Sequence, residues 1–171
     1  MKRDGRRPAP HPTIKDAMTV PLTRGKFAII DRADAEAVAA WTWCAHAPHK
    51  SRAIFYAAAN VNGKYTTLHR FLWRHWGMPS SHIDHINCDG LDNRRSNLRA
   101  ATPSQNVFNT RIRVDNASGY KGVSRLCGRW SAMISIDGKN KWLGYFATPE
   151  DAAEAYRKKA IETRGQFARL R

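Results

Sequence analysis

The sequence predicts an α+β protein in which a strand–strand–helix unit is followed by a three-stranded antiparallel sheet packed on one helix. Two observations lead to this fold class. Short runs that alternate polar and apolar residues, or that end at Asn-Gly and Asp-Gly pairs, recur along the 171 residues and are typical of antiparallel strands. Thr-Pro pairs at 102–103 and 148–149 carry the chemistry of a helix start. Each helix is therefore expected to follow the strands on which it packs.

The charge of the chain indicates a polyanionic partner. Lys and Arg number 29 and Asp and Glu number 14, which leaves a formal net charge of +15. The pI is near 10.4 and the mean hydropathy is −0.60. No apolar run reaches the roughly 18 residues that a membrane-spanning helix needs. Nucleic acid is therefore the expected partner, and no membrane partner is expected.

Cysteine usage and the N-terminal sequence favour an intracellular, cytoplasmic protein. Cys44, Cys88 and Cys127 lie far apart, and the absence of a Cys-x-x-Cys pair argues against a zinc site or a disulfide framework. The basic start of the chain, residues 1–12, lacks the apolar stretch of a secretory signal. We therefore expect a protein that is not secreted.

A turn-rich stretch at 115–119 separates two differently patterned parts of the chain. In the first part we expect a strand over 26–30, a helix over 33–43, a hairpin over 55–69 that turns at Asn62-Gly63, and a short helix over 70–76 with core-packing aromatics. The expected organisation is a flexible basic arm over 1–19, a mixed strand and helix region over 20–68, a core over 69–114 and a C-terminal domain over 119–171.

Residues 81–106 carry the pattern with the most chemical content. His82–Ile86 alternates as a half-buried strand does, and Ser96–Ala100 can form the returning strand. Thr102 is placed to cap a helix and Pro103 suits its first position, so Asn106 lies one turn into that helix. The unit is therefore predicted as strand, polar loop, strand and helix.

A hydrolytic metal site needs oxygen ligands for a divalent cation and a base for water. Asp84 and His85 are neighbours on a strand, so their side chains point to opposite faces. We expect Asp84 to face the helix and bind the metal with Asn106, and His85 to turn toward solvent. Because these ligands are oxygens, Mg²⁺ or Mn²⁺ is expected rather than Zn²⁺.

This stretch closely resembles the HNH nuclease family, and the resemblance implies a ββα-metal nuclease core around one divalent ion. It implies that His85 is the general base and that Asn97, 12 residues on, is the middle Asn that orients the loop and the base. Asn106, 21 residues after His85, would bind metal beside Asp84, as in phage-intron homing nucleases. Asn93 competes with Asn97 for the middle role.

Residues near this unit also have expected roles, and for His69 two roles remain open. His69 lies ahead of Arg70, where it either contacts the phosphate or leaving group or is a buried, hydrogen-bonded histidine. The Asp and Gly residues between 89 and 92 are expected to be ordinary loop formers. Phosphate contacts are expected from Arg70, Arg94, Arg95 and Arg99.

The C-terminal part predicts three strands, over 119–125, 129–136 and 141–146, and then a helix that starts at Thr148. In the second strand Trp130, Ala132, Ile134 and Ile136 share the predicted core face, and Arg129, Ser131, Met133 and Ser135 share the open face. Residues at helical spacing, Ala152, Ala155, Tyr156 and Ala160, are expected to pack on the sheet.

The same segment is similar to the DNA-binding domain of plant ethylene-responsive transcription factors. The similarity rests on Gly-Tyr-Lys-Gly-Val at 119–123, Trp-Leu-Gly-Tyr-Phe at 142–146 and Thr-Pro-Glu-Asp-Ala-Ala-Glu-Ala-Tyr at 148–156. It implies DNA contacts by Lys121, Arg125, Arg129 and Trp142, and a phosphate contact by Tyr156. Ser124, Met133 and Ser135 depart from the charged readers of the plant domains, so no target sequence is implied.

Together, the two resemblances imply a metal-dependent, site-preferring DNA endonuclease of the homing type. Its expected partner is double-stranded DNA, with no small-molecule substrate, and a monomer is the simplest expectation for one such core. Two alternatives remain open. The first is a non-catalytic, sequence-specific DNA-binding regulator with a vestigial nuclease core, and the second is an RNA-binding protein.

Overall fold

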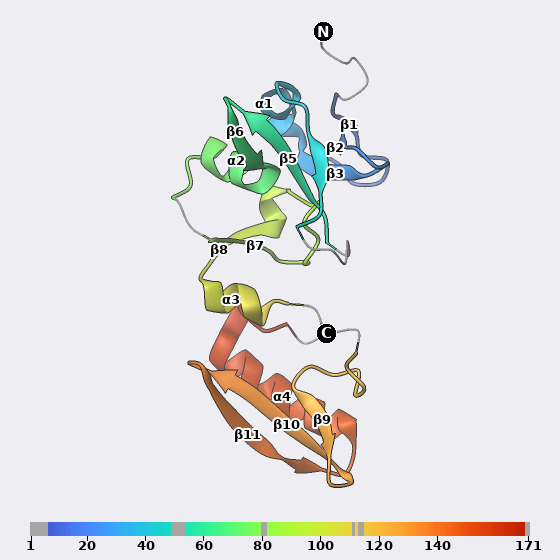
Figure 1. Ribbon diagram of the computed structural model, residues 1–171, viewed down its shortest axis with the longest axis vertical. Coiled ribbons are helices and arrows are strands. Elements are labelled where there is room, and N and C mark those ends of the chain that lie inside the picture. Colours follow the sequence, from blue (N-terminus) through green and yellow to red (C-terminus); the bar gives the residue numbers. More distant parts are fainter. Residues whose placement is uncertain (1–6, 49–53, 80–81, 111, 113–114, 170–171) are drawn as a thin grey trace. The chain divides into compact units, whose positions relative to one another are not determined.

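The computed structural model describes residues 7–48, 54–79, 82–110, 112 and 115–169 (Figure 1). The chain divides into two units, residues 1–102 and residues 103–171. This division falls before the helix that contains Asn106, whereas the sequence pattern groups that helix with the core over 69–114. The expected domain boundaries remain predictions, and the two units are described separately.

The first unit contains two three-stranded antiparallel sheets. One has the order β1-β2-β3 and the other the order β4-β5-β6. Residues 9–10 and 17–21 belong to the first of these sheets, so the expected flexible arm contributes β1 and the start of β2 to that sheet. The strands are β1 (Ala9–Pro10), β2 (Ala17–Pro21), β3 (Phe27–Asp31), β4 (Cys44–His46), β5 (Tyr56–Val61) and β6 (Lys64–Thr67).

The helices of the first unit differ in extent from the expected ones. The predicted helix over 33–43 is a 3₁₀ turn, η1 (Arg32–Asp34), followed by α1 (Ala35–Ala39). It ends early because the Val38 carbonyl accepts hydrogen bonds from the Trp41 amide and the Trp43 indole. Helix α2 (Leu68–His75) begins two residues earlier than expected, so His69 is helical.

One apolar core joins the two sheets to α2. Its most buried members include Ile30, Val38, Trp43, Leu68 and Leu72, each at most 1% exposed. Phe71 and Trp76 pack against this core and Trp73 is buried, which confirms the core role predicted for these aromatics. The predicted Asn62-Gly63 turn is also confirmed, since both residues have positive φ.

The predicted strand, loop and returning strand are present as a two-stranded sheet. β7 (His82–His85) pairs with β8 (Leu98–Ala101) in antiparallel register, so that Asp84 lies opposite Arg99. Asn97 differs from expectation because it lies in a 3₁₀ turn, η2 (Arg95–Asn97), that precedes the returning strand.

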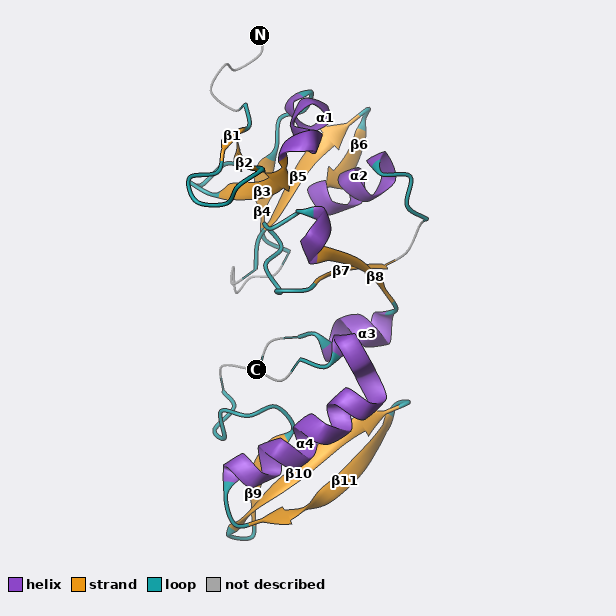
Figure 2. Cartoon of the chain, turned by 180° about the vertical axis from the view of Figure 1, so that it is seen from behind, coloured by secondary structure: helices purple, strands orange, loops and turns teal. Residues whose placement is uncertain are grey.

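The second unit has a short helix, a three-stranded antiparallel sheet of order β11-β10-β9 and a long helix. Figure 2 shows α4 along one face of this sheet. Thr148 caps α4, because its Oγ1 accepts a hydrogen bond from the Asp151 amide, as predicted. The elements are α3 (Pro103–Phe108), β9 (Val123–Leu126), β10 (Arg129–Ile136), β11 (Lys139–Phe146), α4 (Pro149–Arg164) and a 3₁₀ turn, η3 (Gly165–Phe167).

The first predicted strand of this sheet starts four residues later than expected. Gly119 and Gly122 both have positive φ, so the chain turns before it can pair at Val123. A Cβ atom at Gly122 would lie 2.2 Å from the Tyr156 ring, which only glycine avoids. Ala132, Ile134, Ala152 and Ala160 then complete the core between sheet and helix.

Among the described residues, no helix is both long and apolar enough to cross a bilayer.

Candidate active site and DNA-binding surface

His85 is the centre of a cluster of rings at the end of β7. Its ring centroid lies 5.1 Å from that of His69 and 5.9 Å from that of Tyr56. His85 is only 7% exposed, so the expectation that it turns toward solvent is wrong: the side chain packs between β5 and α2.

Burial keeps both histidines in the form that accepts a proton. It lowers the pKa of His85, while the Asn93 side chain and the Asp84, Asp89 and Asp92 carboxylates oppose this fall. Burial, His85 and Arg70 together lower the pKa of His69 to about 3. Near neutral pH the cluster therefore offers neutral imidazole, which is what a general base requires.

Asn97 braces the loop that follows His85. Its Oδ1 accepts a hydrogen bond from the Asn87 amide at 3.0 Å, and its Nδ2 donates to the Asp92 carbonyl at 2.7 Å. Its backbone carbonyl accepts from the Ile86 amide next to His85. This geometry is the loop-holding part of the role predicted for Asn97.

Asn93 occupies a different place from Asn97. It is fully buried, its Nδ2 donates to the Leu91 carbonyl, and its side chain acts directly on the pKa of His85. Its backbone amide donates to the Ile29 carbonyl of β3 at 2.7 Å. The two asparagines therefore have different environments, since Asn97 holds the loop and Asn93 lies against His85.

Tyr56 is a site residue that the sequence pattern did not single out. It lies on β5, and its ring contacts both His69 and His85. Gly90 makes this possible, because a Cβ atom there would lie 2.5 Å from the Phe55 carbonyl and 2.7 Å from the Tyr56 ring. The glycine in an apparently ordinary loop was the only available signal.

Asp84 forms a nearly buried ion pair with Arg99 across the two strands. Both Nε and one terminal nitrogen of Arg99 donate to Asp84 Oδ2, at 2.8 and 2.7 Å. Asp84 therefore already holds a cationic group next to His85. Asn106 lies half-buried in α3 of the second unit, and its joint ligation of a metal with Asp84 remains a prediction.

In the second unit, the uncovered face of the sheet is more apolar than expected. The register places Leu126 beside Arg129, Met133 beside Trp142, and Tyr145 beside Ser131. Trp142 is 54% exposed and contacts the Tyr145 ring edge-on, at 5.1 Å between centroids. Met133 is also exposed, whereas Ser131 is buried beneath its neighbours.

The comparisons with known proteins bear on this geometry. The HNH endonuclease family model matches residues 67–108, which contain the His69 and His85 cluster, the braced loop and α3. The mimivirus protein named uncharacterized HNH endonuclease L560, from Acanthamoeba polyphaga mimivirus, is 36% identical over 106 residues, 59% of this chain and 54% of that protein. Protein 3.8 of Escherichia phage T7 is 36% identical over 92 residues, 53% of this chain and 75% of that protein.

The chain belongs to the HNH endonuclease family. It spans about half the length of the mimivirus relative. Its C-terminal region is similar to plant proteins such as the AP2-like ethylene-responsive transcription factor AIL7 of Arabidopsis thaliana, which is 53% identical over 53 residues, 29% of this chain and 11% of that protein. No solved structure matches.

The donor chemistry of the HNH segment fits a divalent cation. HNH nucleases generally depend on one. The Asp84 carboxylate offers the oxygen ligand that Mg²⁺ or Mn²⁺ prefers, and it already carries the positive Arg99 group. Which metal this member uses is a proposal.

The arginines predicted to bind phosphates in the HNH part have different environments. Arg70 is exposed on α2 and Arg95 lies over the Trp76 ring. Arg94 is held by Asp92 through two hydrogen bonds of 2.8 and 2.7 Å, and Arg99 is held by Asp84. Arg94 and Arg99 therefore brace the site, and a phosphate contact by either would compete with that role.

The DNA contacts predicted for the second unit also separate into two groups. Arg129 and Trp142 lie on the open face. Arg125 instead lies over Trp130 on the helix side, and Lys121 Nζ donates to the Phe108 and Thr110 carbonyls. Tyr156 is 4% exposed and its hydroxyl accepts from Arg164, so burial argues against the predicted phosphate contact.

Proposed function

We propose that the protein is a metal-dependent, site-preferring DNA endonuclease in which His85 takes a proton from the attacking water. The observation that carries the proposal is the buried pair of His85 and Asp84, held by a loop that Asn97 braces, inside the segment that the HNH model matches. Hydrolysis of a phosphodiester bond needs such a base within reach of water at phosphorus.

The proposed chemistry divides between the base and a cation site. Neutral His85 accepts the proton, and Asn93 and Asn97 keep the ring and the loop in place. Asp84 and Asn106 would hold one Mg²⁺ or Mn²⁺ ion, which when bound stabilises charge on the leaving 3′ oxygen. His69 would contact the phosphate or the leaving group, and the support is that its buried Nδ1 has no hydrogen-bond partner among the described residues.

The second unit is proposed to bind the DNA target through the uncovered face of its sheet. The support is the similarity to the plant transcription factors and the exposure of Arg129 and Trp142 on one face. A sheet of two or three strands fits the major groove, where side chains meet base edges.

A plasmid-nicking assay with Mg²⁺ or Mn²⁺ tests the catalytic proposal. We expect His85→Ala to lose cleavage by at least about 100-fold, which is the usual contribution of a general base. His46→Ala, which removes an exposed histidine of the same unit, is the matched control and should cut like the wild type.

Two outcomes would contradict the proposal. A His85→Ala variant that cuts as fast as the wild type would exclude His85 as the base. A wild-type protein that binds duplex DNA tightly but cuts none would instead identify the non-catalytic regulator, and equal competition by duplex RNA would favour an RNA-binding protein.

A further inference from the structure

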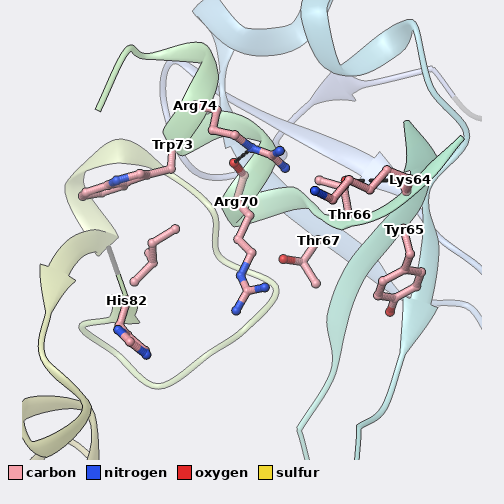
Figure 3. A pocket seen from close by; sticks show the side chains of 9 residues that line it. Lys64, Tyr65, Thr66, Thr67, Arg70, Trp73, Arg74 and His82 are labelled. Carbon is pink, nitrogen blue, oxygen red and sulfur yellow. Dashed lines mark hydrogen bonds between the residues drawn. The ribbon is translucent and has the colours of Figure 1, made fainter. Parts of the chain in front are cut away.

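A pocket opens beside the His69 and His85 cluster of the first unit. It has a volume of about 550 Å³ and lies between β6, α2 and the start of β7 (Figure 3). Thr67 lines the pocket, and its Oγ1 lies 3.2 Å from Nε2 of His69. Thr67 therefore links the pocket lining to His69, whose ring contacts that of the proposed base, His85.

The lining of this pocket is cationic. Lys64, Arg70, Arg74 and His82 contribute to it, and none of the described lining residues carries a carboxylate. Figure 3 shows the guanidinium of Arg70 reaching into the space below Arg74, whose Nε donates to the Arg70 carbonyl. In the described part of the chain, Lys64, Arg70 and Arg74 form no ion pair with an acidic residue. Their charges are thus available to an anion from outside.

A second pocket, of about 440 Å³, continues from the first. It shares the Lys64, Thr66 and Arg74 walls and extends to His75, again without a carboxylate among its described lining residues. The two hollows share these lining residues, and together they make up a surface that we name the β6–α2 track and define by Lys64, Thr66, Thr67, Arg70 and Arg74. It includes the exposed side chains of Arg70 and Arg74 on α2.

A single small anion would occupy only one of these hollows. A polynucleotide strand presents one negative charge per nucleotide, so consecutive phosphates match a row of cations better than an isolated anion does. The exposed ring of Tyr65 beside the cations suits the sugars and bases between them.

We propose that the β6–α2 track holds two consecutive phosphates of the DNA strand on one side of the bond that is cut, with Lys64 and Arg74 as their main contacts. This assignment rests on the proposed nuclease function and adds a strand-binding path and two residues to it. Lys64 and Arg74 keep the strand in line with His85, and they take no part in the chemistry.

The salt dependence of binding tests the track directly. The full-length chain is titrated with a fluorescent DNA duplex without divalent metal, which prevents cleavage. Each phosphate contact contributes about 0.9 to the slope of log affinity against log salt concentration. We expect the double variant Lys64→Ala/Arg74→Ala to have a shallower salt dependence, with the magnitude of the slope smaller by about 1.8. Both residues are exposed, so neither change removes core packing.

A matched control removes the same charge elsewhere in the first unit. Lys15→Ala/Arg32→Ala, at two exposed positions outside the track, should keep the wild-type slope. An unchanged slope in the track variant, or the same change in both variants, would overturn the proposal. Competition by duplex RNA as strong as by duplex DNA would overturn the assignment to DNA.

Neutral methylphosphonates placed one at a time along the cut strand then locate the contacts. Wild-type cleavage should fall at two consecutive positions beside the cut, and the track variant should be insensitive at those two positions. Equal sensitivity of both proteins would overturn the track. Failure of the wild type to cut any DNA would refute the nuclease function, while the salt slopes would still decide whether the track binds DNA.

Discussion

His69 lies in the first turn of α2, where its Nε2 contacts Thr67 and its ring packs against His85. Its pKa of about 3 lies below the ordinary value of 6.5. In the unfolded chain His69 takes up a proton below about pH 6.5. In the folded chain it takes up a proton only below about pH 3. The stability that neutral His69 contributes is therefore complete above pH 6.5 and is lost as the pH falls below it.

The loss of stability below pH 6.5 leads to a measurable prediction. Between pH 6.5 and pH 5, His69 should remove up to about 2 kcal/mol from the free energy of unfolding. His69→Gln should flatten the profile of unfolding free energy against pH, measured by urea denaturation, by that amount. His46→Gln is the control, and part of the slope should persist because the pKa of His85 is also lowered. Identical profiles for His69→Gln and the wild type would contradict the pKa assignment.

The β7–β8 pair places an ion pair where the metal is proposed to bind. Arg99→Ala leaves the Asp84 carboxylate nearly buried without its guanidinium, which should cost about 3 kcal/mol of unfolding free energy. A divalent cation at Asp84 should return part of that loss. We therefore expect Mg²⁺ to raise the melting temperature of Arg99→Ala more than that of the wild type.

Arg94→Ala is the matched control for this element. It breaks the neighbouring ion pair with Asp92, whose carboxylate is also buried. It leaves Asp84 and Arg99 in contact. Mg²⁺ should raise the melting temperature of Arg94→Ala no more than that of the wild type. Equal stabilisation of the two variants by Mg²⁺ in thermal melts would show that Asp84 is not the metal ligand.

At the scale of the whole molecule, the proposal assigns cleavage and target binding to different units. Arg129→Ala/Trp142→Ala changes two exposed side chains on the uncovered sheet face and leaves the His85 cluster intact. We expect DNA binding to weaken by about 30-fold, given about 1 kcal/mol for each of the two lost contacts, with an unchanged cleavage rate at saturating DNA. Gel-shift titration and single-turnover cleavage measure the two quantities, and a slower rate at saturation would contradict the division.

The sequence predicts elements well where local chemistry determines them. The Asn62-Gly63 turn and the Thr148 cap depend on residues close in the chain, and the structure has both. The alternation predicted for β10 is present only in part, because Ser131 of the open face is buried. Predictions that depended on tertiary contacts were less successful. Burial of His85 requires Tyr56 and His69 from other elements, and the partners of Lys121 and Arg94 are side-chain choices that periodicity does not encode.

The exchange of hydrogen bonds between β3 and the loop after His85 ties the N-terminal sheet to the site. The Ile29 amide donates to the Leu91 carbonyl, and the Ile29 carbonyl accepts from the Asn93 amide. Ile29 lies far outside residues 67–108, the segment that the family model matches. A graft of that segment alone onto another scaffold would lack the strand that anchors Asn93, so the smallest transferable form of the proposed active site has to include β3.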